Sequence, residues 1–202
     1  MSPRAYRLGL REATVEATRT RILEAACQLL ASGGFGAFTI DTVAHAADVS
    51  RMTVYNQFGS KTGLLEAIFD WMAQHGGVQR LGEAANHPDP EAGLALFVRG
   101  CCALWASNRD VHRRLVGFAA VDPDFEAALL AREQRRAGPV RALVTRLSER
   151  DRHPAPNQVE TAVQHLMAVT SFATIDALAG PHGDPQAVAE LVTALARCAL
   201  DD

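Results

Sequence analysis

Apolar residues recur every three or four positions along most of this 202-residue chain, which is the spacing of amphipathic helices. Between residues 14 and 32, for example, Ile22, Ala26 and Leu30 share one helical face, and a pair of glycines follows it. No segment alternates apolar and polar residues as a strand does. The pattern predicts helices over residues 14–32, 40–46, 63–74, 90–106, 109–119, 123–149, 156–179 and 185–200, with one more short helix after Ser50. We therefore expect an all-α fold with about nine helices.

Glycine and proline divide the chain into two parts. Residues 76–91, GGVQRLGEAANHPDPE, are predicted to be a boundary between an N-terminal part at 1–75 and a C-terminal part at 76–202. Residues 1–12 are polar and are predicted to be a flexible arm, which either follows DNA or is a solvated tail. The arm contains Arg4, Arg7 and Arg11.

The stretch FTIDTVAHAADVSRMTVYNQFGSK, residues 38–61, contains two short helical patterns separated by a turn. Thr39 and Ser50 are suited to capping the two helices, because a hydroxyl oxygen accepts a free amide of the first turn. Asp48 is suited to the turn, since aspartate tolerates the left-handed conformation better than most residues. Val54 and Phe58 lie four apart and anchor the second helix inward. This arrangement predicts a helix-turn-helix.

The opposite face of the second helix carries side chains that can hydrogen-bond and do not need burial, as a helix that reads the major groove requires. They are Arg51, Met52, Thr53, Tyr55, Asn56 and Gln57. Lys61, the only lysine beside nineteen arginines, lies in the first turn of the next helix. A cation there is mildly unfavourable against the helix dipole, and a nearby phosphate would offset this effect. The alternative is a solvated surface lysine.

Residues 34–65 resemble the DNA-binding signature of the tetracycline-repressor (TetR) family. The resemblance rests on Thr39, Val43-Ala44, Ala47, Val49-Ser50, Val54-Tyr55, Phe58, Ser60-Lys61 and Leu64-Leu65. Four positions depart from the usual pattern: Asp48 replaces glycine, Met52 replaces a small residue, Gln57 replaces an aromatic residue or histidine, and Gly59 replaces proline.

The resemblance implies that this stretch binds double-stranded DNA. We expect Arg51 to contact a base, with Thr53 and Asn56 next, because the guanidinium fork matches guanine O6 and N7. Phosphate contacts are expected from Thr39, Tyr55, Gln57 and Lys61. Ser50 and Met52 complete the predicted DNA-binding set.

The C-terminal part is helical by pattern, with Gly138-Pro139 expected to kink or split the helix at 123–149. The helices at 156–179 and 185–200 carry apolar residues on more than one face, so a second partner is expected for each. In the family the last two long helices dimerise, which implies a homodimer interface at Val163, Leu166, Thr170, Val188, Leu191, Val192 and Leu195.

The family also usually encloses a pocket for a small effector in this part of the chain. The residues expected to line such a pocket are Arg99, Trp105, His112, Phe118, Phe125, His165 and Phe172. The same aromatic residues equally suit an ordinary core, and His165 equally suits a satisfied interface position.

Composition narrows the classes of protein. Residues 1–61 hold seven lysines or arginines against five acids, while the whole chain has a net charge of -3, so the charge asymmetry is weak. No apolar run reaches the length of a membrane span and no signal peptide is visible, so we expect a cytoplasmic protein with no membrane partner. Cys27, Cys101, Cys102 and Cys198 lack metal or disulfide spacing and are interpreted as small buried hydrophobes.

No histidine pair or catalytic motif is present in the sequence, which predicts no enzyme activity, no cofactor and no metal. The sequence therefore predicts a homodimeric regulator that binds a palindromic operator and is a repressor released by a small-molecule effector. Alternatives are an activator, a regulator without an effector, a helical ligand-binding protein or enzyme that merely retains the helix-turn-helix, and a purely structural helical dimer.

Overall fold

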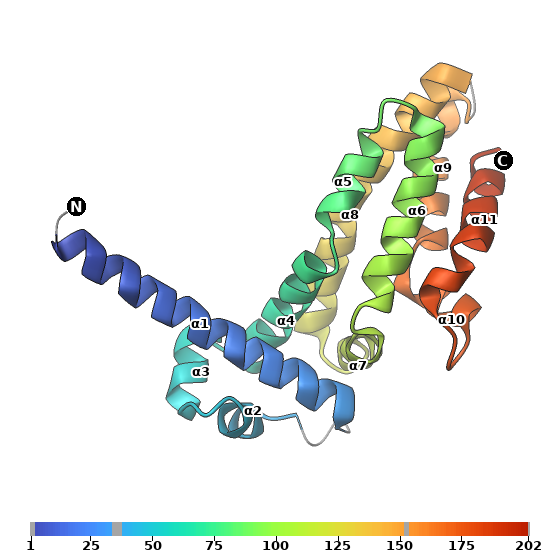
Figure 1. Ribbon diagram of the computed structural model, residues 1–202. Helices are drawn as coiled ribbons and strands as arrows, with labels where there is room; N and C mark the ends of the chain where they lie inside the picture. Colours follow the sequence, from blue (N-terminus) through green and yellow to red (C-terminus); the bar gives the residue numbers. More distant parts are fainter. Residues whose placement is uncertain (1–2, 34–37, 152–153, 202) are drawn as a thin grey trace. The chain divides into compact units, whose positions relative to one another are not determined.

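The computed structural model describes residues 3–33, 38–151 and 154–201, and these residues form only helices and their connections (Figure 1). The elements are α1 (Pro3–Ser32), α2 (Ile40–Ala46), α3 (Arg51–Phe58), α4 (Lys61–His75), α5 (Gln79–Ala85), α6 (Pro90–Ala106), α7 (Arg109–Ala119), α8 (Pro123–Asp151), η2 (Pro156–Gln158), α9 (Val159–Val169), α10 (Phe172–Ala179), η3 (Pro185–Val188) and α11 (Ala189–Asp201). The expected all-α class is therefore confirmed.

The chain forms two compact units. The first comprises Met1–Trp71 together with Arg113–Glu126, and the second comprises Met72–His112 together with Ala127–Asp202. The first unit thus contains the helix-turn-helix and also takes residues 113–126, a segment that the sequence pattern placed in the C-terminal part. Helices α4, α7 and α8 each contribute residues to both units.

Residues 3–12, which were expected to belong to an irregular arm, are helical, because α1 begins at Pro3. The segment RAYRLGLREATVEA is rich in alanine, leucine, arginine and glutamate, which favour helix even without a clear apolar stripe. The side chains of Arg4, Arg7 and Arg11, expected near DNA, lie outside the described part of the structure, as does the second glycine of the pair after α1.

The boundary expected at residues 76–91 contains a helix, α5, that was not predicted from the sequence. Its Leu81, Ala84 and Ala85 have the i, i+3, i+4 spacing of a helical face and are buried. α5 packs against α6, where the absence of a side chain at Gly100 makes room for Leu81. A Cβ atom at Gly100 would lie 2.7 Å from Leu81 Cδ2, so a larger residue there would require the Leu81 side chain to shift.

Three other expectations about helices in the second part are revised by the structure. Pro139 lies inside a continuous α8, so this helix tolerates the missing amide instead of splitting. The single helix expected at 156–179 is divided at Thr170–Ser171 into α9 and α10, and Ser171 caps α10 by accepting from the Thr174 amide at 3.2 Å. The helix expected at 185–200 begins with the separate turn η3.

The break between α9 and α10 is stabilised from two other helices. Arg136 of α8 donates to the Met167 carbonyl at 3.0 Å and to the Thr170 hydroxyl at 2.8 Å. Trp105 of α6 donates its indole N–H to the Thr170 carbonyl at 3.0 Å. Carbonyls at the end of α9 therefore have donors despite the interruption, which explains why the chain can turn there.

Two more arginines of the second unit satisfy helix ends in the same way. Arg146 donates to the carbonyls of Ala85 and His87, at 2.9 and 2.5 Å, where α5 ends. Arg109 donates to the carbonyls of Asp176 and Gly180, at 3.0 and 2.6 Å, where α10 ends. A forked guanidinium can reach several carbonyls at once, which a lysine cannot do with the same geometry.

Within the described residues, no single helix is long and apolar enough to cross a membrane. One pair, Pro156–Val169 and Phe172–Ala179, passes by length and composition together but is bent by 46°.

Candidate DNA-binding site

Side-chain caps stabilise the helix-turn-helix, and each capping residue lies within a few residues of the backbone amide to which it bonds. Thr39 and Thr42 form a reciprocal capping box, in which the Thr39 hydroxyl accepts from the Thr42 amide at 3.1 Å and the Thr42 hydroxyl accepts from the Thr39 amide at 2.9 Å. Asp48 has a φ of 52°, so the expected left-handed turn residue is confirmed. Ser50 then caps α3 by accepting from the Thr53 amide at 3.0 Å.

Helices α2 and α3 pack through fully buried small or branched residues, Val43, Ala44, Ala47 and Val54. Two arginines of α1 hold the ends of these helices. Arg21 donates to the Ala47 carbonyl at 3.0 Å, and Arg19 donates to the Gln57 carbonyl at 3.2 Å. These two arginines therefore fix α2 and α3 on α1 while keeping their positive charge.

The face of α3 away from this core carries the predicted contact residues. Arg51, Met52 and Asn56 are exposed, and Thr53, Tyr55 and Gln57 are half-buried. Met52 is 65% exposed, an unusual position for a large apolar side chain on a short polar helix. The structure thus places the predicted α3 residues on one surface of the first unit, with Thr39 and Ser50 at the N-terminal ends of α2 and α3.

Arg51 is held by two residues on this surface. Its Nη1 donates to Asp41 Oδ2 of α2 at 3.3 Å, and its Nη2 donates to the Tyr55 hydroxyl at 3.3 Å. Its guanidinium carbon also lies 5.5 Å from the centre of the Tyr55 ring. The hydrogen bond to Tyr55, followed by the charge of Asp41, raises the pKa of Arg51 above its ordinary value. Asp41 was not predicted from the sequence, and only the crossing of α2 over α3 brings it to Arg51.

Lys61 has aromatic neighbours that the sequence did not indicate. Its ammonium lies 4.7 Å from the ring centre of Phe118 and 5.7 Å from that of Phe38. The two rings meet edge to face at 5.9 Å. The lysine side chain is exposed, so its ammonium remains accessible to a phosphate from the solvent side.

The residues predicted to line an effector pocket do not form one group. Trp105, His112 and Phe172 meet in the second unit, with ring centres 5.2 to 5.8 Å apart, whereas Phe118 and Phe125 belong to the first unit. His165 is exposed on α9 and lies 3.4 Å from the Ala199 carbonyl.

His112 is the buried titratable group of this aromatic cluster and is only 3% exposed. Burial lowers the pKa of His112 to about 4, against the opposing effect of the nearby Asn108 and Ser107 carbonyls. The ring is therefore neutral at physiological pH and stacks on Phe172 with an interplanar angle of 27°. The three rings are in mutual contact, with Trp105 and His112 buried and Phe172 half-buried.

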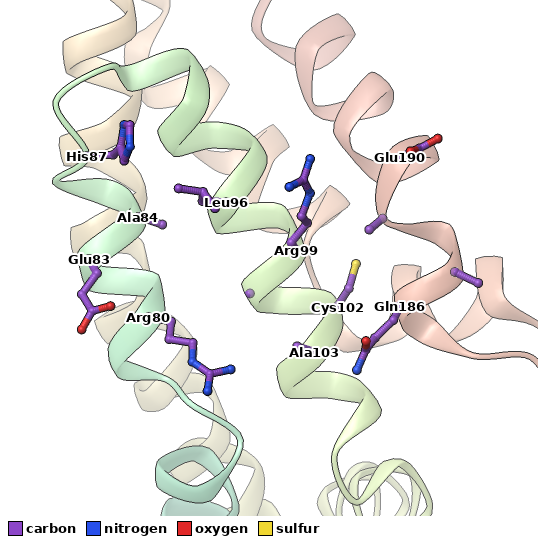
Figure 2. Close-up of a pocket in the computed structure, with 13 residues that line it drawn as sticks. Arg80, Glu83, Ala84, His87, Leu96, Arg99, Cys102, Ala103, Gln186 and Glu190 are labelled. Carbon is purple, nitrogen blue, oxygen red and sulfur yellow. The ribbon is translucent and has the colours of Figure 1, made fainter.

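A groove of about 770 Å³ lies elsewhere in the second unit, along α5, α6 and the beginning of α11 (Figure 2). Small residues make much of its wall, and Arg80 and Arg99 are its cationic side chains. Figure 2 shows Arg80 extending from α5 and Arg99 from α6. Arg99 is the one predicted pocket residue that lines this groove.

The predicted dimer residues divide by burial. Val163, Leu166, Thr170 and Val192 are covered by their own chain, and Val188 is half-buried. Leu191 and Leu195 are 49% and 38% exposed. Ala194 and Cys198 continue this exposed stripe of α11, so the interpretation of Cys198 as a buried hydrophobe is wrong, while Cys27, Cys101 and Cys102 are buried. Among the described residues, no cluster of histidine, cysteine or acids could hold a metal ion.

The first unit thus contains a capped helix-turn-helix with a polar outer face, which is the arrangement that places a recognition helix in the major groove in DNA-binding proteins. Residues 22–68 match the family described as bacterial regulatory proteins, tetR family. This match covers the helix-turn-helix and parts of the helices on either side of it, so this part of the chain is similar to the DNA-binding region of that family.

Two curated relatives match part of the chain. YvkB of Bacillus subtilis, an uncharacterized HTH-type transcriptional regulator, is 43% identical over 58 residues, which are 29% of each chain. The HTH-type transcriptional regulator AlkX of Mycobacterium tuberculosis is 40% identical over 60 residues, which are 30% of this chain and 28% of AlkX. The matched segment thus spans less than a third of these two relatives.

Solved structures share the whole fold at low sequence identity. PfmR of Thermus thermophilus, a TetR family regulator, has a TM-score of 0.66 at 22% identity, with 89% of this chain and 97% of PfmR covered. FadR of Bacillus subtilis, solved with stearoyl-CoA, has a TM-score of 0.72 at 17% identity, with 88% of this chain and 97% of FadR covered. This structural likeness covers 88% or more of the chain, whereas the two curated relatives match less than a third of it.

Proposed function

We propose that this protein is a homodimeric, sequence-specific DNA-binding transcriptional regulator, and that it is a repressor released by a small organic effector. The observation that supports DNA reading best is the outer face of α3, where Arg51, Met52 and Asn56 are exposed. A structural helix gains nothing from presenting these side chains together, whereas base edges in the major groove offer them partners. In a dimer, two such helices would enter successive major grooves ~34 Å apart and read a palindrome.

Each contact residue has a proposed role. Arg51 reads a guanine, with Thr53 and Asn56 beside it, while Thr39, Tyr55, Gln57 and Lys61 hold phosphates and set the register. Because Arg19 and Arg21 donate to carbonyls of the helix-turn-helix, their side chains are less free to reach phosphates around α3. A single copy is therefore expected to bind weakly, and useful affinity needs two copies.

The second copy is proposed to pack on α9 and α11. These two helices pack together in the second unit, and Leu191, Ala194 and Leu195 form an exposed apolar stripe along α11. Exposed Gln164 and His165 of α9 supply polar groups on the adjoining helix. A stripe of this kind suits a symmetric contact between identical helix pairs.

The effector is proposed to bind in the groove of the second unit lined by Arg80 and Arg99. Support comes from its volume of about 770 Å³, which is within the range of small-molecule sites. It also comes from FadR of Bacillus subtilis, a protein of the same fold that was solved with stearoyl-CoA. An effector that favours an arrangement of the dimer unsuited to DNA must lower DNA affinity by linkage. Helices α4 and α7, shared by both units, are the proposed connections.

The test is retention of genomic DNA fragments on the purified protein at moderate salt, followed by gel shifts on the enriched fragment. Selective binding is expected. Arg51→Ala should weaken binding to the enriched fragment about tenfold to a hundredfold and should weaken binding to scrambled DNA less. Arg135→Ala, which removes an exposed arginine of α8, is the matched control and should change neither. Binding of all fragments alike, or equal losses on both DNAs for Arg51→Ala, would contradict sequence reading by α3.

A reporter gene placed behind the enriched fragment separates repressor from activator. Repression predicts higher reporter output when the gene for this protein is deleted. Lower output on deletion would support the activator alternative, with the DNA-binding part of the proposal intact.

A further inference from the structure

The surface expected to meet DNA contains a carboxylate, Asp41, that a simple phosphate-binding surface would not include. Asp41 lies in the first turn of α2, and its side chain is 65% exposed. A negative charge at this place repels phosphates and lowers non-specific affinity. Its side-chain partner is Arg51, ten residues later on a different helix.

We propose that Asp41 and Tyr55 are positioning residues that hold the Arg51 guanidinium in a preset orientation, so that guanine discrimination by Arg51 depends on them. This inference rests on the proposed function, since it concerns how α3 reads DNA. It assigns to Asp41 a role in sequence specificity rather than in affinity.

The geometry restrains the guanidinium from two helices at once. Asp41 of α2 accepts from Nη1 at 3.3 Å, and the Tyr55 hydroxyl, one turn along α3 from Arg51, accepts from Nη2 at 3.3 Å. The Tyr55 ring, whose centre is 5.5 Å from the guanidinium carbon, provides a further contact. A free arginine samples many rotamers and must lose that freedom on binding a base, whereas a restrained one has lost part of it already.

The restraint still leaves donors for DNA. A guanidinium has five N–H groups, and these two hydrogen bonds engage one on each terminal nitrogen. Nε–H and one N–H on each terminal nitrogen stay available for the O6 and N7 acceptors of a guanine. The ion pair lies at the surface, with the Arg51 side chain 60% exposed, so the pair is expected to add little to folding stability. A role in stability alone therefore does not account for it.

A competing explanation is that Asp41 merely complements the positive end of the α2 dipole, as acids in first turns do. That role predicts lower stability on removal of the charge but unchanged base preference. Asp124, an exposed acid in the first turn of α8 and in the same unit, offers a matched control with no ion pair among the described residues. Asp124→Asn removes the same charge from the same kind of position.

The experiment measures binding by fluorescence anisotropy to the enriched operator and to copies in which each guanine in turn is replaced by 7-deazaguanine, which lacks the N7 acceptor. For the wild-type protein, one replacement is expected to weaken binding about tenfold, so that the ratio of the Kd for the substituted operator to the Kd for the unmodified operator is about ten. Asp41→Asn should shrink that ratio to about twofold to threefold while keeping or raising affinity for scrambled DNA. Tyr55→Phe should shrink it less, and Asp124→Asn should leave it unchanged.

The double variant Asp41→Asn/Arg51→Ala provides the coupling test. If Asp41 acts through Arg51, the double variant should discriminate no less than Arg51→Ala alone. Full retention of the ratio in Asp41→Asn, or a further loss in the double variant, would overturn the positioning role. Thermal melts of each variant detect loss of folding, and the conservative Tyr55→Phe keeps the proposal testable if Asp41→Asn is unstable.

The outcomes also separate this inference from the proposed function. A wild-type protein that selects no operator overturns both. A wild-type protein that selects an operator, with an unchanged ratio in Asp41→Asn, overturns only the positioning role and leaves sequence-specific binding standing.

Discussion

His112 makes a quantitative prediction about stability, because its ring is buried between Trp105 and Phe172. Its pKa is about 4 in the folded protein, against an ordinary value of 6.5. As the pH falls below 6.5, the unfolded chain takes up a proton at this position while the folded chain does not. The folded state therefore loses stability from pH 6.5 down to about pH 4, and keeps the full contribution above pH 6.5.

The size of the effect follows from the two pKa values. A shift of this size corresponds to about 3 kcal/mol in total, and about 1.8 kcal/mol of it should be lost between pH 7 and pH 5. Replacing His112 by Phe or by Gln removes the titrating group. Each variant should therefore lose about 1.8 kcal/mol less than wild type over this interval, whatever its stability at pH 7.

The assay is urea unfolding at one fixed protein concentration, followed by circular dichroism and by tryptophan fluorescence, since Trp105 lies against the His112 ring. Fixing the concentration keeps any contribution of a dimer constant. His165→Gln, which replaces an exposed histidine, is the matched control and should follow the wild type. Equal losses between pH 7 and pH 5 for wild type and both His112 variants would refute the reasoning.

Three further predictions concern binding and assembly. Lys61→Ala should weaken binding to all DNA sequences alike and lower the slope of log K against log salt by about one unit in anisotropy titrations. Lys61→Arg should keep this slope. A loss of affinity for some sequences only would contradict a phosphate contact. Met52, which is exposed and apolar on α3, should touch a thymine methyl group. Replacing one operator thymine by uracil should therefore weaken binding of the wild type severalfold in gel shifts and leave binding of Met52→Ala unchanged. Leu195→Glu should give monomers in analytical ultracentrifugation, because a charge would enter the proposed contact between copies; a dimer that persists would place the interface elsewhere.

The features predicted correctly from the sequence depend on residues close together along the chain. Thr39 and Ser50 cap their helices by bonds that span three residues, and Asp48 takes its turn conformation without help from distant parts. Patterns of this kind are complete within about ten residues, so they can be read before the fold is known.

The features missed depend on contacts between distant segments. The α9–α10 break needs donors from Arg136 and Trp105, which are more than thirty residues away from Thr170. α5 was missed because its short apolar face lies among glycines and prolines and becomes stable only against α6. The role of Asp41 likewise needs the crossing of α2 and α3.

The predicted effector residues show a different limit. Trp105, His112 and Phe172 are as apolar in sequence as pocket walls or core residues would be, and in the structure their rings contact one another. Burial of an aromatic ring is the same signal in both cases, and only the space around the rings distinguishes them.

The use of arginine at helix ends has a consequence for the alkaline range. Arg109, Arg136 and Arg146 each hold carbonyls at the end of a helix, and a guanidinium stays protonated beyond any pH at which a folded protein is handled. Lysines in these places would lose their charge near pH 10 and release the carbonyls. The chain has one lysine and nineteen arginines, so it has almost no basic side chain that alkaline solution can deprotonate. Alkaline unfolding must therefore begin at groups other than these helix ends.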